Sequence, residues 1–152
     1  MDMETKITGM DEVERKFKAL ANPRLAKNAA RRSARKAMVI VRNAARNNAK
    51  AIDDKNSDEK IWKNIAIAAG RSRDANAVVM RVGVRGGASF SNPNPPNIPG
   101  GDTRHWRFIE FPSVNNPGTP FMRQALANNI QAVTDSFAQN FSAELDKELA
   151  KL

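Results

Sequence analysis

Apolar residues recur every three or four positions over three stretches of the chain, and this spacing predicts three amphipathic helices. The first predicted helix covers residues 11–20. The second, much longer helix starts at Asn22-Pro23 and continues to Asp53, because proline is well tolerated in the first turn of a helix. The third runs from Pro120 towards the C-terminus. Its apolar stripe consists of Met122, Leu126, Ile130, Val133, Phe137, Phe141, Leu145 and Leu149. Part of so long a stripe is expected to meet another subunit.

The middle of the chain has a different pattern. Residues 53–60 include no apolar residue and predict a loop, whereas 65–69 and 77–85 predict two strands joined by the polar turn 71–76. An antiparallel hairpin is the simplest arrangement of these strands. Residues 86–104 contain four glycines and four prolines, a composition typical of a long, flexible loop.

A third strand is predicted at 105–111, HWRFIEF, where an apolar run precedes a turn rich in Pro, Gly and Asn. We expect its aromatic side chains to pack in the core, since aromatic rings bury large areas. The step Gly118-Thr119-Pro120 then predicts a helix start, with threonine as the N-cap and proline at the first helical position.

These elements predict an α+β fold. A small antiparallel sheet, formed by the hairpin and the 105–111 strand, would pack against the long basic N-terminal helix and the amphipathic C-terminal helix. With 152 residues the chain is long enough for one modest core, so we expect a single domain over 1–152.

Charge is concentrated on the long helix. The formal net charge of the chain is +9, and the segment Arg24–Lys50 alone carries nine Lys or Arg and no acidic residue. Most of these cations share one side of the predicted helix, which makes that side a candidate surface for a partner or for DNA. The candidate basic surface consists of Lys27, Arg31, Arg35, Arg42, Arg46 and Lys50.

Three interpretations of this basic surface stay open. Clustered Lys and Arg neutralise phosphates, which would allow non-specific contact with nucleic acid. An acidic protein neighbour is the interpretation that the charge favours over DNA, by electrostatic complementarity. The third interpretation is a solvated face that only promotes solubility. No recognised DNA-binding motif accompanies the charge, so sequence-specific readout is not expected.

The candidates for catalysis or cofactor binding are few. The chain has no cysteine and only one histidine, His105, so a zinc centre or a Cys-His pair cannot be assembled from it. The glycines at 83, 86 and 87 lack the spacing of a phosphate-binding loop. Glu110 could pair with Arg107 or Arg123, but no second titrating group is evident for acid-base catalysis. We therefore expect no enzyme activity, no cofactor and no metal.

No run of apolar residues is long enough to span a membrane, and the N-terminal residues lack the layout of a signal peptide. We therefore expect no membrane partner and synthesis in the cytoplasm.

The order of residues around the turn resembles a known family. Residues 106–111, WRFIEF, are followed by turn residues and then by PFMRQAL at 120–126. This order is similar to that of the tail-completion and head-tail joining proteins of long-tailed bacteriophages. The short helix after Gly9 and the long, basic, alanine-rich helix fit the same family. One departure is that Pro112-Ser113 stands where that family usually has Gly-Thr after the Glu-Phe pair.

The resemblance implies a virion structural protein that assembles as a ring, expected to be hexameric, at the neck of the particle. Its partners would be the head-tail connector and the tail terminator or tail tube proteins, with non-specific contact to phage DNA as a further expectation. The residues of the strand-helix motif would then have structural roles; they are Trp106, Phe108, Glu110, Phe111, Pro120 and Phe121.

Overall fold

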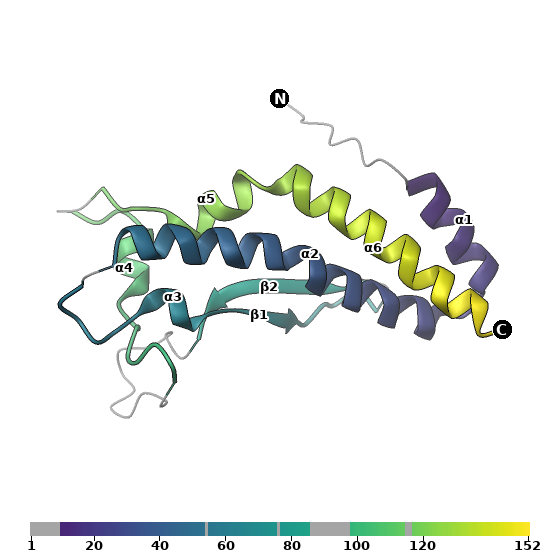
Figure 1. Cartoon of the computed structure of the whole chain (residues 1–152), viewed down its shortest axis with the longest axis horizontal. Helices are drawn as coiled ribbons and strands as arrows, with labels where there is room; N and C mark the ends of the chain where they lie inside the picture. The colour runs from purple at the N-terminus through teal and green to yellow at the C-terminus, as the bar shows by residue number, and fades with distance from the viewer. Residues whose placement is uncertain (1–9, 54, 76, 86–97, 115–116) are drawn as a thin grey trace. The chain divides into compact units, whose positions relative to one another are not determined.

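The computed structural model describes residues 10–53, 55–75, 77–85, 98–114 and 117–152. Helices and a two-stranded antiparallel sheet confirm the α+β class (Figure 1). The elements are α1 (Met10–Leu20), α2 (Pro23–Ala51), α3 (Ile61–Asn64), β1 (Ile65–Gly70), β2 (Val79–Val84), α4 (Trp106–Glu110), α5 (Phe121–Ala127) and α6 (Ile130–Ala150).

The contacts divide the chain into two compact units. Unit 1 comprises the described parts of Met1–Ile40, Ala69–Arg81 and Asn129–Leu152, and unit 2 comprises those of Val41–Ala68 and Val82–Asn128. Both α2 and the hairpin contribute one part to each unit. The expected single domain over 1–152 stays a prediction.

The core of unit 1 forms where α1, the first half of α2 and α6 pack together. Its buried side chains are Val13, Leu20, Ala26, Ala29, Phe141 and Leu145. The small alanines of α2 leave room for the larger Phe141 and Leu145 of α6, which fill the space between the helices. At the edge of this core the Lys16 ammonium contacts Ser142 and Asp146 at 2.7 and 2.8 Å, which fixes α1 against α6.

The predicted start of the long helix is confirmed at atomic detail. The Asn22 side-chain oxygen accepts hydrogen bonds from the backbone N–H groups of Arg24 and Leu25, at 3.1 and 3.3 Å. These donors have no partner inside the helix, so Asn22 acts as an N-cap. The residue before it, Ala21, adopts a φ of 51°, a left-handed conformation that ends α1 and turns the chain into α2.

Unit 2 is organised around a buried asparagine. The amide of Asn64 donates to the Gly101 carbonyl at 3.1 Å and to the Thr103 hydroxyl at 2.7 Å. Its oxygen accepts from the Gly100 N–H at 2.8 Å. A side chain at Gly100 would collide with Asn64 and with the backbone of Lys60, which explains glycine there. These bonds attach the segment 98–104 to the end of α3.

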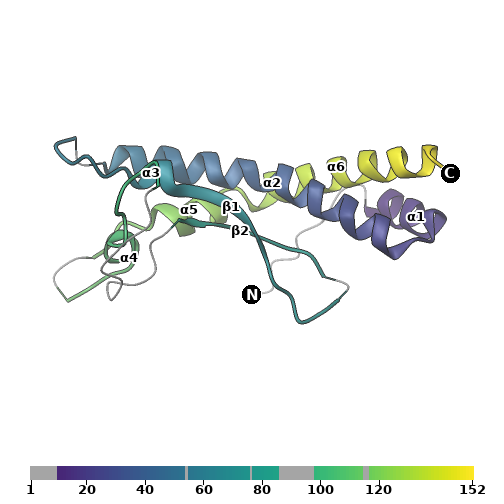
Figure 2. The same ribbon diagram turned by 90° about the horizontal axis from the view of Figure 1, so that it is seen from below.

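The predicted hairpin is confirmed. Strands β1 and β2 lie side by side and run in opposite directions in both ribbon views (Figures 1 and 2). Within the turn, the Asp74 N–H bonds the Ser72 hydroxyl at 3.1 Å and the Ala77 N–H bonds the Asp74 carbonyl at 3.1 Å. Of the expected loop 86–104, residues 86–97 lie outside the described residues, and 98–104 form turns without regular structure.

The predicted strand at 105–111 is wrong, because residues 106–110 form the short helix α4. Its backbone bonds are local: the N–H of Phe108 bonds the His105 carbonyl, and that of Phe111 bonds the Arg107 carbonyl, both at 3.0 Å. A strand needs a neighbouring strand to satisfy these groups. In the described part of the chain the sheet contains β1 and β2 alone, so the expected third strand is not present there.

The predicted helix from Pro120 onwards is also corrected. The structure has two helices with a break at Asn128 and Asn129. The N–H of Asn128 still bonds the Gln124 carbonyl at 3.0 Å, which closes α5, and the N–H of Val133 bonds the Asn129 carbonyl at 2.9 Å, which opens α6. Asparagine favours such helix ends because its short polar side chain suits non-helical backbone.

Candidate functional site

The first half of the candidate basic surface lies on unit 1. The Lys27 ammonium donates a hydrogen bond to the Ala75 carbonyl in the hairpin turn, which leaves Lys27 half-buried. Arg31 and Arg35 are exposed, and Arg31 makes a long bond of 3.4 Å to the Asn28 side chain. Lys27 and Arg31 line an open hollow of about 590 Å³ together with the end of the hairpin. We call this feature the hairpin hollow.

The second half of the predicted surface holds unit 2 together. The Arg46 guanidinium donates twice to the Ile65 carbonyl, at 3.0 and 2.8 Å, and burial together with the charges of Arg42 and Arg85 lowers its pKa. The Lys50 ammonium lies 4.5 Å from the centre of the Trp62 ring, a cation–π contact. These two cations serve the fold, so the six predicted residues do not form one uniform surface.

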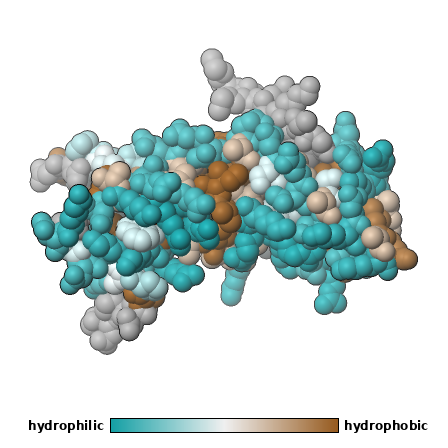
Figure 3. Space-filling view, in the orientation of Figure 1, coloured by the Kyte–Doolittle hydropathy of each residue, from teal (hydrophilic) through white to brown (hydrophobic). Residues whose placement is uncertain are grey.

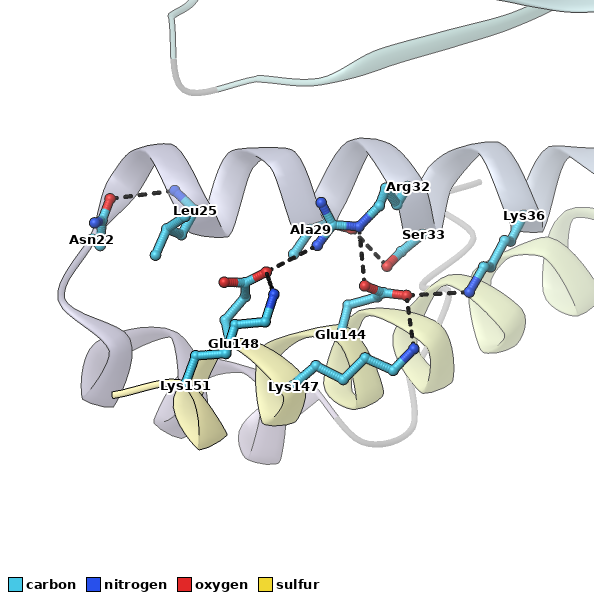
Figure 4. A network of polar contacts seen from close by, with 10 residues as sticks. All are labelled: Asn22, Leu25, Ala29, Arg32, Ser33, Lys36, Glu144, Lys147, Glu148 and Lys151. Atoms are coloured by element: carbon cyan, nitrogen blue, oxygen red, sulfur yellow. Dashed lines mark hydrogen bonds and ion pairs between the residues drawn. The ribbon is translucent and has the colours of Figure 1, made fainter.

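Unit 1 contains a charged cluster that the sequence did not predict (Figure 4). Glu144 and Glu148 of α6 are buried beside α2. Arg32 bonds Glu144 at 3.0 Å and Glu148 at 3.3 Å, and Lys36 bonds Glu144 at 3.2 Å. Arg32 and Lys36 are four residues apart on α2, and Glu144 and Glu148 are four residues apart on α6, so each pair lies on one face of its helix. This spacing was the signal in the sequence that could have indicated the cluster. The sequence could not show that the two helices face each other.

The ionisation of Glu144 follows from this cluster. Burial alone would raise the pKa of Glu144, but the hydrogen bonds from Lys36 and Arg32 outweigh it, with help from the charge of Lys147. The pKa of Glu144 is therefore held below its usual value, and its carboxylate stays charged next to the cations of α2.

In the predicted strand-helix motif, Glu110 connects α4 to α5. Its side chain is 1% exposed and accepts hydrogen bonds from the N–H groups of Met122 and Arg123, both at 2.9 Å. Arg123 also pairs with the Glu110 carboxylate at 3.1 Å and donates to its carbonyl at 2.9 Å. Glu110 of α4 therefore caps the start of α5. The predicted N-cap, Thr119, is wrong, because Pro120 occupies the N-cap position and makes no side-chain hydrogen bond there.

The aromatic residues of the motif do not all pack in the core. Phe121 is 1% exposed, but Phe108 and Phe111 are 59% and 46% exposed, so the predicted core role is wrong for both. Val114 and Leu126, which also belong to unit 2, are exposed as well. Hydrophilic side chains cover most of the face of the molecule that Figure 3 shows. We call Phe108, Phe111, Val114 and Leu126 the exposed apolar set.

His105 lines a small hollow of unit 2 with a volume of about 290 Å³, together with Ser57 and Glu59. The His105 Nδ1 lies 3.8 Å from a Glu59 carboxylate oxygen, beyond hydrogen-bond distance. The Ser57 hydroxyl accepts the Glu59 N–H at 3.1 Å instead of bonding the histidine. A hydrogen-bonded pair of nucleophile and base is therefore not formed among these three residues.

Among the residues that the structure describes, no group of three or more His, Asp or Glu is arranged to hold a metal ion. None of the described helices is both long and apolar enough to cross a lipid bilayer.

Several of the buried polar side chains in the described residues, such as Glu110 and Glu144, connect one element to another, and large apolar side chains are exposed on both units. Residues 11–111 match the family described as "Bacteriophage HK97-gp10, putative tail-component". The chain belongs to this family and is a structural tail component of a bacteriophage. The match includes α1 to α4, whereas Pro120 and Phe121 lie beyond it.

No curated protein and no solved structure gives a significant match to the chain.

Proposed function

We propose that the chain forms a ring in the neck of the virion, where it completes the tail and joins it to the head connector. Membership of the tail-component family is the observation that carries this proposal. A structural role without catalysis agrees with the family, and the virion is the corresponding location. The expected ring is hexameric, and the expected partners are the connector and the tail terminator or tail tube proteins.

The exposed apolar set supports assembly through unit 2. Phe108 is 59% exposed, and covering so large an aromatic side chain with another protein surface would lower the free energy of the complex, because apolar area is removed from water. Closed rings form when one surface of a subunit binds a different surface of the next. The exposed apolar set is proposed as one of these two surfaces.

The first experiment removes the gene from the phage or prophage and inspects the lysate by electron microscopy. DNA-filled heads and finished tails that lie unattached are the expected result. Tails of abnormal length would instead assign the chain to tail termination. Intact, infectious particles would contradict a role in the neck.

Non-specific binding of nucleic acid is the second candidate function, because Arg31 and Arg35 are exposed on a chain with a net charge of +9. Affinity for duplex DNA should then fall steeply as salt rises from about 50 to about 300 mM, since counterions are released from the phosphates. Equal binding at both salt concentrations would reject this candidate.

A further inference from the structure

The hairpin hollow combines cationic and apolar side chains in one concave surface of unit 1. Its charged lining residues are Lys27 and Arg31 from α2, and Arg71 and Asp74 from the hairpin. The remaining lining is largely small or apolar and includes Val78, Val79 and Met80, which are half-buried. A surface of this kind can bind an apolar side chain and an anionic group at the same time.

The charge around the hollow is positive. Arg31 and Arg71 are both exposed, so their guanidinium groups are accessible to a ligand, whereas Lys27 is held by the Ala75 carbonyl. Asp74 is the one acidic residue in the lining. Two accessible guanidinium groups favour a ligand with carboxylate or phosphate groups, since each can bind such groups through two parallel hydrogen bonds.

Two observations favour a carboxylate ligand on a protein over the phosphates of DNA. The lining includes aliphatic side chains such as Val79 and no aromatic ring on which a base could stack. Two cations at the C-terminal end of α2 are also engaged within the protein, because Arg46 bonds the Ile65 carbonyl and Lys50 lies against Trp62. A duplex that followed the whole helix would therefore find these two cations already in contact with other groups.

We propose that the hairpin hollow is the docking site for a partner protein segment in which acidic residues flank an apolar side chain. The carboxylates bind Arg31 and Arg71, and the apolar side chain lies against Val79 and Met80. This inference rests on the proposed function, because it names the chemistry of one contact that a neck protein would make. The charge complementarity of the lining selects this occupant.

The test uses the purified full-length chain and a short fluorescent peptide in which glutamate alternates with leucine. Wild-type protein should bind this peptide, and binding should weaken at high salt because the contacts are ionic. Arg31→Glu and Arg71→Glu should each weaken binding by about tenfold or more, since each change places like charges face to face. Arg24→Glu is the matched control: it makes the same change of charge at an exposed arginine of α2 outside the hollow.

The proposal would be overturned by no binding of the peptide, by equal binding of a version with glutamine in place of glutamate, or by equal losses in Arg24→Glu and Arg31→Glu. Duplex DNA that competes for the same two arginines more strongly than the peptide would also overturn it, in favour of nucleic acid. The gene-removal phenotype is scored independently. Unattached heads and tails without peptide binding would reject the hollow alone, and peptide binding with intact virions would reject the neck role alone.

Discussion

At the scale of single residues, buried carboxylates organise both units. Glu110 caps α5 in unit 2, and Glu144 holds two cations of α2 in unit 1. A buried carboxylate is stable only when charged or hydrogen-bonding partners surround it. Each of these residues therefore fixes the position of the element that supplies its partners.

Replacing Glu110 tests this role directly. Glu110→Ala removes the acceptor for two backbone N–H groups at the start of α5 and the partner of Arg123. We expect the free energy of unfolding to fall by roughly 2 kcal/mol, the combined effect of losing a helix cap and a buried hydrogen-bonded pair. Urea denaturation measures this change in the free energy of unfolding. Glu59→Ala, at an exposed glutamate of the same unit, should change stability little, and equal losses in both variants would contradict the capping role.

The stability of unit 1 should depend on pH through Glu144. Its pKa is lower in the folded protein than in the unfolded chain, so its contribution is present above the unfolded pKa and is lost as pH falls through the folded pKa. Thermal unfolding measured between about pH 5 and pH 3 should show this loss. Glu144→Gln should be less stable near neutral pH and show a shallower decline in acid. An unchanged decline would show that other carboxylates cause it.

At the scale of secondary structure elements, α6 is held by packing against α1 and α2. Leu145 is 0% exposed within this core, whereas Leu126 of α5 is 47% exposed. Leu145→Ala should lower the free energy of unfolding by about 3 kcal/mol, because it removes buried methyl groups and leaves a cavity. Leu126→Ala should cost much less. Denaturant unfolding of the two variants measures both losses of stability. Similar losses would contradict the packing of α6 against α1 and α2.

The short helix α4 shows how neighbours override an apolar pattern. Residues 106–110 have the composition of a strand, but a strand requires a partner to satisfy its backbone groups. The helical turn satisfies these groups locally and directs Glu110 towards the first N–H groups of α5. The segment that was predicted as a strand followed by a helix therefore consists of α4 followed by α5, and Glu110 connects the two helices.

At the scale of the whole molecule, assembly is predicted to depend on the exposed apolar set. Phe108→Ser should shift the oligomer towards the monomer by about tenfold or more in dissociation constant, since buried aromatic residues are frequent hot spots of interfaces. Phe17→Ser is the matched control, because Phe17 is 46% exposed on unit 1 and lies outside this set. Light scattering coupled to size-exclusion chromatography measures the change. Dissociation by both variants alike, or by neither, would contradict the proposed interface.

The sequence by itself determined that two helices and a hairpin form, with the helices predicted at 11–20 and from Asn22-Pro23 to Asp53 and observed at 10–20 and 23–51. Their apolar spacing, the Asn22-Pro23 start and the polar turn are local properties. The sequence also showed that the positive charge is concentrated on the second helix. Tertiary structure alone decided that Arg46 and Lys50 serve the fold, that Arg32 and Lys36 meet buried glutamates, and that 106–110 is helical. These outcomes depend on which elements come together, and the spacing of residues within one helix does not show which other element it will face.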